Sequence, residues 1–375
     1  MNAWKVVPAA VAAASVGVAT ARSAAGLPKQ LGAHPDAIGN YASKSAAWRD
    51  GKFHNVEPAG QVDPTEQMST LRDMLSGRAG RKPAKPIPVE VPRFPEQVDD
   101  LGVTWFGHAT ALIEIDGMRV LVDPVWGKRV SPSPTIGPSR LHPVPLVLSA
   151  LPPLDAIVLS HDHYDHLDMA TVVELAQVQE APFVVPLGVG AHLRSWGIAG
   201  DRITELDWGE THAIGELSFG CCRARHFSGR GLRRDTTLWA SWALIGPRHR
   251  VYFGGDSGYS TGFSEIGTQY GPFDLALIPI GAYDKRWRDI HLDPEEAILA
   301  FVDVQSGRSK YGVMLPIHWA TFVLAPHGWD DPIERAVAAA ERAGVNLWTP
   351  PPGRRLTADT AREQTTARWW SAVAQ

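Results

Sequence analysis

The sequence predicts a layered α/β fold, in which helices cover sheets of largely buried strands. Short, wholly apolar runs recur along the chain, and such runs are typical of strands that are buried on both faces. Helix signals alternate with these runs, including an N-cap and first-turn proline pair at Asp293-Pro294. Of the 375 residues, 44% are apolar and 20% are charged, which provides a sizeable core and excludes a globally disordered chain.

The predicted strands begin near residue 101. Two apolar runs between Val103 and Val122 flank Asp116-Gly117, a dipeptide typical of a tight β-hairpin turn. The other predicted strands are the short apolar runs at residues 156–160, 183–185, 251–253, 275–278 and 313–317.

Two predicted helices have clear start signals. Residues 293–296 (Asp-Pro-Glu-Glu) combine an N-cap, a first-turn proline and a capping-box glutamate ahead of the helix 297–302. Residues 331–334 (Asp-Pro-Ile-Glu) repeat this pattern before a helix that ends at Gly344. Strands and helices therefore alternate, as expected for sheets covered by helices.

The first 22 residues form a distinct segment. Residues 6–21 carry no charge and follow the basic residue Lys5. As a helix this run would span about 24 Å, less than the roughly 30 Å hydrocarbon core of a bilayer. Its length and the small residues 19–21 (Ala-Thr-Ala) are typical of a secretory signal peptide. We therefore predict a signal-like or membrane-anchor segment and an exported or membrane-associated protein. The alternative is an alanine-rich helix packed on a cytoplasmic protein.

Three regions follow this segment. Residues 23–97 are predicted to form a proline-rich extension, because five prolines within residues 83–95 favour an extended segment along a surface or between domains. The extension contains one candidate helix near residues 64–76. The main domain is predicted at residues 98–356, and residues 357–375 form a C-terminal tail.

Charge and cysteine content exclude several classes of protein. The formal net charge of −4 shows no basic excess, which argues against sequence-independent binding of nucleic acid. The two cysteines, Cys221 and Cys222, are neighbours, so neither a disulfide framework nor a cysteine-rich zinc module is expected. We expect both side chains to fill the core.

A histidine-rich segment follows the predicted strand 156–160. Its sequence is His-Asp-His-Tyr-Asp-His over residues 161–166. Residues two apart in an extended segment face the same side, so His161 and His163 can bind one metal ion together. Asp165 and His166 follow where the chain turns toward a helix near Asp168, which aims them at a second position. Imidazole and carboxylate groups suit Zn²⁺ and similar cations. A polar surface loop is the alternative.

Three more candidate ligands follow other buried runs. They are His226, Asp256 and His318. Ligands of open α/β sheets gather at one edge of the sheet, where strand ends meet. Each residue alone also fits a hydrogen-bonded polar side chain without a metal, but together they supply the ligands that one loop lacks.

Eight motifs between residues 101 and 325 carry a family resemblance. They are Thr104–Thr110, Leu121–Pro124, Ser160–Asp168, Gly255–Tyr259, Gly271–Leu275, Pro279–Tyr283, His291–Ala297 and Ile317–Phe322. In these motifs the chain resembles the metallo-β-lactamase-fold hydrolases. Within them it is most similar to the branch that contains N-acylphosphatidylethanolamine-hydrolysing phospholipase D.

This resemblance implies an αβ/βα four-layer sandwich with two zinc ions between its sheets, although another divalent ion would also suit these ligands. It assigns seven ligands. One zinc would bind His161, His163 and His226, the other would bind Asp165, His166 and His318, and Asp256 would bridge both. Asp123 and His108 are expected to orient these ligands from behind.

A reaction follows from this resemblance. A hydroxide shared by two cations is a nucleophile near neutral pH and would attack the phosphorus of a phosphodiester. His291 matches a position near the substrate phosphate and is expected to assist the leaving alkoxide. The expected catalytic residues are therefore His291 and the bridging Asp256. The alternative for His291 is a surface-loop histidine.

The resemblance further implies a phospholipid substrate, cleaved to phosphatidate and an N-acylethanolamine. The apolar N-terminus suits a membrane surface, and Trp287, Trp319 and Phe322 would either line an acyl channel or fill the core. A lactonase or small-molecule phosphodiesterase of the same superfamily is the main alternative. A non-catalytic, zinc-stabilised envelope scaffold is a remote one. The sequence does not indicate the oligomeric state.

Overall fold

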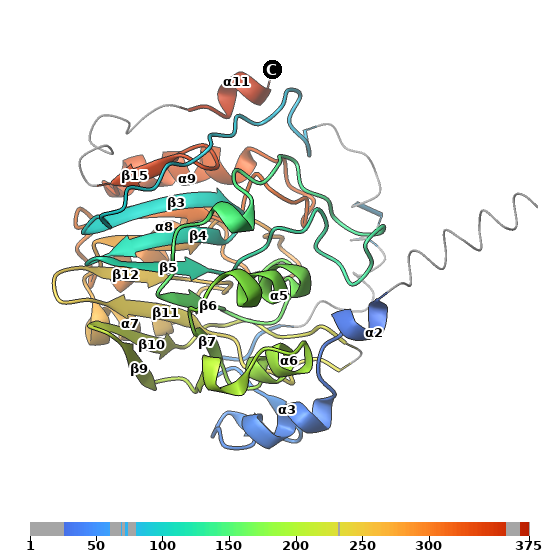
Figure 1. The fold of residues 1–375 in the computed structure, drawn as a ribbon. Helices are drawn as coiled ribbons and strands as arrows, with labels where there is room; N and C mark the ends of the chain where they lie inside the picture. Colours follow the sequence, from blue (N-terminus) through green and yellow to red (C-terminus); the bar gives the residue numbers. More distant parts are fainter. Residues whose placement is uncertain are drawn as a thin grey trace, which may run out of the picture.

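Two mixed β-sheets lie face to face in the computed structural model (Figure 1), which describes residues 26–60, 69, 72–73, 80–231, 233–357 and 368–374. Within these residues the first sheet has the strand order β15-β3-β4-β5-β6-β7-β8, and the second has the order β14-β13-β12-β11-β10-β9. The first sheet consists of β3 (Leu101–Gly107), β4 (Thr110–Ile115), β5 (Met118–Val122), β6 (Ala156–Val158), β7 (Phe183–Pro186), β8 (Ile203–Leu206) and β15 (Arg355–Thr357). The second consists of β9 (Thr211–Ile214), β10 (Leu217–Cys222), β11 (Ser241–Ile245), β12 (Arg250–Phe253), β13 (Leu275–Pro279) and β14 (Val313–Ile317).

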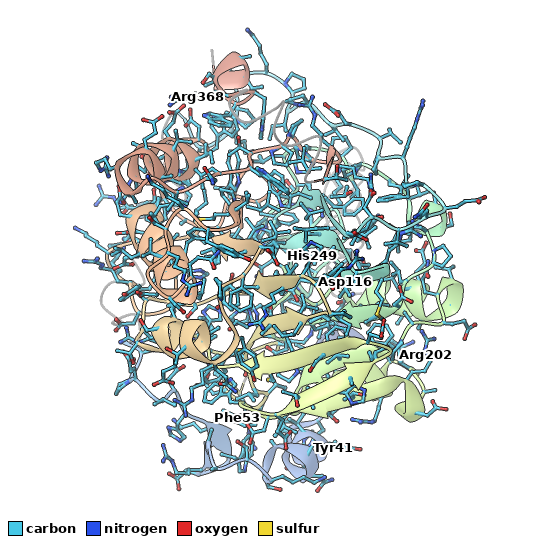
Figure 2. The ribbon with its side chains drawn as sticks, turned by 90° about the vertical axis from the view of Figure 1, so that its left-hand side faces the viewer. Tyr41, Phe53, Asp116, Arg202, His249 and Arg368 are labelled. Carbon is cyan, nitrogen blue, oxygen red and sulfur yellow. The ribbon has the colours of Figure 1, made fainter. Side chains whose placement is uncertain are left out.

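Helices cover the outer face of each sheet. They are α5 (Met169–Val178) and α6 (Val189–Ser195) on the first sheet, and α7 (Gly262–Tyr270), α8 (Pro294–Val304) and α9 (Asp331–Ala343) on the second. Figure 2 shows the four layers edge on, with the strands between the two helical layers. This arrangement confirms the predicted αβ/βα four-layer sandwich.

The alternation of side chains along each strand explains the two cores. In β4, Ile113 and Ile115 belong to the large cluster that fills the space between the sheets and continues under α7, α8 and α9. Leu112, between Ala111 and Ile113, belongs to the separate cluster under α5 and α6. Successive strand residues point to opposite faces, so a wholly apolar strand is buried on both sides, as the short apolar runs predicted.

The predicted hairpin turn at Asp116-Gly117 is confirmed, but the predicted apolar run before it needs a correction. β4 and β5 pair antiparallel around Asp116-Gly117, with Ile115 opposite Met118. The apolar run that begins at Val103, however, is not one strand but two, β3 and β4. The chain reverses at Gly107 and His108, whose φ angles are 105° and 54°. The left-handed conformation of these two residues produces the reversal.

The capped helices are also confirmed in part. Asp293 accepts a hydrogen bond from the Glu296 N–H at the start of α8, and the reciprocal bond completes the capping box. The second predicted capping box is wrong, because α9 begins one residue earlier, with Asp330 as an N-cap that makes no side-chain hydrogen bond. Asp331 instead accepts from the Tyr283 hydroxyl. The helix does end at Gly344, whose φ is 69°.

The described part of the predicted extension packs on the domain. It contains α2 (Leu27–Gln30), α3 (Pro35–Ala42), β1 (Trp48–Arg49) and β2 (Lys52–Phe53). Ile38 and Phe53 join a buried cluster with Leu187 and Trp239, and Figure 2 shows Phe53 at this end of the molecule. At the C-terminus, α11 (Ser371–Ala374) follows the buried Trp370. Among the described residues, short 3₁₀ turns also occur at Leu148–Ala150 and Gly200–Arg202.

Two predictions fall outside the described residues. The signal-like segment 1–22 lies wholly outside them, and the candidate helix near residues 64–76 lies largely outside them. Among the helices that are described, none has the length and apolar character needed to cross a membrane.

Candidate metal centre

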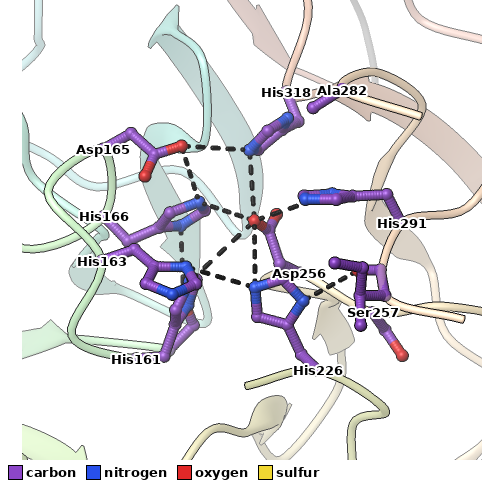
Figure 3. Close-up of polar contacts among 12 residues, drawn as sticks. His161, His163, Asp165, His166, His226, Asp256, Ser257, Ala282, His291 and His318 are labelled. Atoms are coloured by element: carbon purple, nitrogen blue, oxygen red, sulfur yellow. Dashed lines mark hydrogen bonds and ion pairs between the residues drawn. The ribbon is translucent and has the colours of Figure 1, made fainter. Parts of the chain in front are cut away.

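The seven predicted ligands meet at one edge of the sandwich, beyond the carboxyl ends of four strands (Figure 3). The segment 161–166 follows β6, which lies between β5 and β7 in the parallel part of the first sheet. In the second sheet, His226, Asp256 and His318 follow β10, β12 and β14. Both sheets therefore contribute side chains to the same space.

The side chains form two groups of four. Within each group, one ligand atom from every residue lies within 4.8 Å of the others. The groups are His161, His163, His226 and Asp256, called the first cluster here, and His108, Asp165, His166 and His318, called the second cluster. A third, overlapping group contains Asp256, His291 and His318.

Asp256 belongs to the first cluster and also lies close to two histidines of the second. Its Oδ2 atom is 3.1 Å from Nε2 of His166 and 3.2 Å from Nε2 of His318 in the second cluster. The same oxygen is 3.7 Å from Nε2 of His226 and 3.9 Å from Nε2 of His161 in the first. One carboxylate can therefore reach both clusters, which is the position that a bridging ligand requires.

Hydrogen bonds behind the ligands fix their orientation. Asp123 accepts from Nδ1 of His166 at 2.6 Å and from the Ser160 N–H at 2.7 Å. The carbonyl of Ile290 accepts from Nδ1 of His226 at 2.8 Å. A histidine that donates from Nδ1 has its Nε2 lone pair available. In both residues, Nε2 faces the centre of the site.

His108 contacts the other members of the second cluster through Asp165. Its Nε2 is 2.8 Å from Oδ2 of Asp165, and its ring centroid is 3.9 Å from that of His318. The backbone of His108 is held by Thr321 Oγ1, which accepts from its N–H at 2.7 Å, and by Trp105, whose Nε1 donates to its carbonyl at 2.8 Å. The predicted contact with a ligand is present, but the ring is also close enough to be counted among the ligand groups.

Three residues of the site have an unfavourable backbone conformation. The φ angles of His108, Asp123 and His318 are 54°, 38° and 65°. Positive φ is uncommon for residues other than glycine and costs free energy that the surrounding packing must offset. Such residues concentrate at functional sites, so this strain marks the same edge of the sandwich as the clustered ligands do.

Burial and neighbouring charges shift the pKa values of the histidines and aspartates in the two clusters. Burial lowers the pKa of His161 and of His226 well below the usual histidine range. Burial alone would also lower the pKa of His318, but the negative charge of Asp256 raises it to about 9. Asp256 shows the opposite balance, because the positive charges of His166 and His318 outweigh its burial and hold its pKa well below the usual range.

The donor set fits divalent cations. Among the described residues, Oδ1 of Asp256, Nδ1 of His291 and Nε2 of His318 are buried and have no hydrogen-bond partner. Such atoms cost free energy unless a ligand satisfies them. Nitrogen and carboxylate ligands that converge from several strands, with ordered partners behind them, suit Zn²⁺ or a similar ion.

His291 faces the cluster from the loop before α8. Its Nδ1 is 3.9 Å from Oδ2 of Asp256, and its ring centroid is 5.1 Å from that of His226. Burial lowers its pKa to about 4, so the ring is neutral at neutral pH. His291 lies in a loop, but its ring faces the cluster, and its role in catalysis stays a prediction.

The three predicted aromatic residues have different surroundings. Trp287 is buried and donates from Nε1 to the Ala282 carbonyl at 2.7 Å. Trp319 stacks between Trp105 and Trp369, with centroid distances of 5.7 Å and 5.4 Å. Trp319 and Phe322 also line a cavity that reaches His318. Both are nevertheless buried, as Trp287 is, so all three fill the core, and contact with a substrate stays a prediction.

Sequence reasoning missed several residues that contact the ligands. The clearest are Ser160, whose hydroxyl contacts Asp123 and Nδ1 of His161, and Asn55, which binds the backbone of His226. Ser160 directly precedes the histidine segment, so its place at the strand end could have indicated a role. Nothing local indicates Asn55, which is 171 residues away from His226 in the sequence.

Comparisons with known proteins agree with this geometry. The sequence profile of the Beta-lactamase superfamily domain matches residues 118–319. An uncharacterised protein of Mycobacterium tuberculosis is 50% identical over 365 residues, which cover 96% of this chain and 97% of the relative. N-acyl-phosphatidylethanolamine-hydrolyzing phospholipase D 1 of Caenorhabditis elegans is 40% identical over 234 residues, which cover 59% of this chain and 64% of that protein.

A solved structure shares the fold. It is Igni18, described as a novel metallo hydrolase from Ignicoccus hospitalis, with a TM-score of 0.53 and 22% sequence identity. The match covers 68% of this chain and 97% of that chain. At this identity the likeness concerns the fold alone.

Proposed function

Because this chain belongs to the β-lactamase superfamily of metal-dependent hydrolases, we propose that it cleaves a phosphodiester with the help of two divalent cations, preferably Zn²⁺. The observation that carries this proposal is the pair of adjoining clusters with Asp256 between them. His161, His163 and His226 would hold one cation; Asp165, His166 and His318 would hold the other. A closed structural site would use four ligands and leave no carboxylate between two groups, so the geometry favours catalysis over a scaffold.

The proposed substrate is N-acylphosphatidylethanolamine or a related phospholipid, cleaved as by a phospholipase D. Support comes from the name of the Caenorhabditis elegans relative and from the cavity beside His318, which Trp319, Phe322 and Leu324 line with apolar surface. An acyl chain that lies over these side chains, at the mouth of this small cavity, would leave the phosphodiester next to the clusters. We further propose that the protein works at a membrane surface, where such a substrate resides.

When bound, the cations would supply Lewis acidity, which activates water near neutral pH and stabilises negative charge on a phosphoryl group. The chain supplies orientation and proton transfer. Asp123 and the Ile290 carbonyl hold the His166 and His226 rings in place. His291, neutral and facing the space beside Asp256, is placed to hold or release a proton at a ring nitrogen as the alkoxide leaves.

A lipid assay tests this function. Purified protein loaded with Zn²⁺ is mixed with N-acylphosphatidylethanolamine vesicles, and products are identified by mass spectrometry. We expect phosphatidate and N-acylethanolamine from the unmodified protein and neither from Asp256→Asn. The absence of phosphatidate, from protein shown to contain two cations per chain, would contradict the lipid assignment. Lactones and small phosphodiesters, the substrates of the main alternative, would then be tested on the same preparation.

A further inference from the structure

The segment 26–60 contacts the first cluster although it lies outside the matched domain. The superfamily domain covers residues 118–319, whereas similarity to the mycobacterial relative extends over nearly the whole chain. Hydrogen bonds from this segment reach the two loops that carry the first cluster's histidines. The extension therefore has contacts at the site that a merely linking segment does not need.

Asn55 makes the most direct of these contacts. Its Nδ2 donates to the carbonyl of His226 at 2.8 Å, and its Oδ1 accepts from the N–H of the same residue at 3.1 Å. Trp239 also donates from Nε1 to this oxygen, at 3.0 Å. The amide of Asn55 thus satisfies both backbone groups of one residue, as a neighbouring strand would.

These bonds matter because they hold the backbone of His226, a proposed ligand that lies in a loop. The residue is fully buried and follows the end of β10 by four positions. The Ile290 carbonyl fixes the ring through Nδ1, while Asn55 fixes the backbone from which the ring extends. Together they determine the direction of Nε2, which lies 3.3 Å from Nδ1 of His163.

A second connection leads from the same segment to the histidine loop. The Ala33 N–H donates to Nδ1 of His192 at 3.0 Å, and Nε2 of His192 lies 3.3 Å from Oδ2 of Asp162. Asp162 separates His161 from His163 in the sequence. Since the loop 161–166 serves both clusters, this connection does not distinguish them, whereas Asn55 contacts a residue of the first cluster alone.

We propose that Asn55 is a positioning residue for the cation of the first cluster, and that the segment 26–60 is thereby part of the metal centre. This inference rests on the proposed binding of two cations. Loss of an outer partner of a metal ligand typically lowers metal affinity by about 10- to 100-fold. Because His226 is the one proposed ligand that Asn55 contacts among the described residues, loss of Asn55 weakens one of the two cations and leaves the other bound.

The test measures Zn²⁺ affinity by competition with a chromophoric chelator, on the full-length protein. We expect Asn55→Ala to weaken one equivalent of Zn²⁺ by about 10-fold or more and to change the other by less than about twofold. Val56→Ala is the matched control, since Val56 is the next residue and its side chain is 62% exposed. His318→Ala, which removes a group of the second cluster, identifies the signal of the other cation.

A second variant, Asn55→Asp, distinguishes the loss of one hydrogen bond from the loss of side-chain volume. It keeps the volume and an acceptor for the His226 N–H but loses the donor to the His226 carbonyl, so it too should weaken the same cation. Unchanged affinities in both variants, or equal weakening of both cations, would overturn the role of Asn55. Fewer than two equivalents on the unmodified protein would overturn the two-cation centre itself, which separates failure of this inference from failure of the proposed function.

Discussion

At one end of the sandwich, histidines and aspartates crowd around Asp256, whereas at the other end Asp116 pairs with His249 (Figures 2 and 3). The two ends belong to the same strands. Asp116 lies in the turn between β4 and β5, whose opposite ends lead to His108 and Asp123. β12 likewise runs from the neighbourhood of His249 toward Asp256.

The ends differ in how their polar atoms are satisfied. Oδ2 of Asp116 accepts from the N–H groups of Arg248 and His249 at 2.8 Å and 3.0 Å, and Oδ1 accepts from Nδ1 of His249 at 2.7 Å. By contrast, Oδ1 of the buried Asp256 has no partner among the described residues. Aspartate and histidine therefore join the two sheets at one end. At the other end, the same residue types include a buried carboxylate oxygen that has no partner among the described residues.

The largest contrast is expected from the same substitution at both ends. Asp256→Asn removes the charge that reaches both clusters, and we expect hydrolysis to fall on the order of 10³-fold, or about 4 kcal/mol in transition-state stabilisation. Asp116→Asn should leave turnover and bound metal unchanged. Steady-state rates and metal content of the two purified variants measure the difference. Equal losses would mean that Asp256 acts through stability only.

Substitutions at two glycines test whether the two ends differ in close packing as well as in charge. Both have positive φ, 56° at Gly255 and 83° at Gly117. A Cβ on Gly255 would lie 2.6 Å from Cβ of Ser160, whereas a Cβ on Gly117 would meet nothing within 4 Å. We expect Gly255→Ala to cost about 3 kcal/mol and Gly117→Ala about 1 kcal/mol in the free energy of unfolding. Urea denaturation in the presence of a chelator measures the free energy of unfolding of both variants. Equal costs would show that the Ser160 side chain moves aside with little loss of stability.

Histidines at the two ends give the next comparison. We expect His291→Ala to lower turnover by about 10²-fold, because its ring is placed for proton transfer, and to leave the metal content unchanged. His249→Ala, at the opposite end, should retain full turnover. Loss of one cation from His291→Ala would instead assign His291 to the ligand set, as its grouping with Asp256 and His318 allows.

The sequence predicted the ligand positions because their signals are local. His161 and His163 alternate just after an apolar run, and Asp256 and His318 each follow another such run, so their strands bring them to one edge. The structure brings these side chains together, while their binding of metal stays a prediction. The layered α/β class likewise follows from apolar runs and helix signals, whereas the four-layer arrangement was implied by the family resemblance.

Contacts between distant segments were beyond this reasoning. Asn55 and His226 meet because the segment 26–60 packs against α6 and the loop that follows β10, and no periodicity encodes that path. The reversal at His108 was missed because apolar residues flank it on both sides, so the two strands β3 and β4 appeared as one run. Tertiary packing, rather than local propensity, decides such features.

The smallest effect is expected at the satisfied end. Asp116→Asn should lower the free energy of unfolding by about 1 kcal/mol at neutral pH, because the charged acceptor of three hydrogen bonds is lost. Hydrogen bonds from the backbone of Arg248 and His249 outweigh partial burial and lower the pKa of Asp116. Its folded pKa therefore lies below the unfolded value of about 3.9, so the stabilisation is present above about pH 4 and is lost as the pH falls through the folded pKa. Urea denaturation at pH 7 and near pH 3 should show the difference between protein and variant shrinking in acid. A difference that persists unchanged in acid would mean that packing of the hairpin turn, and not the carboxylate charge, joins the two sheets at this end.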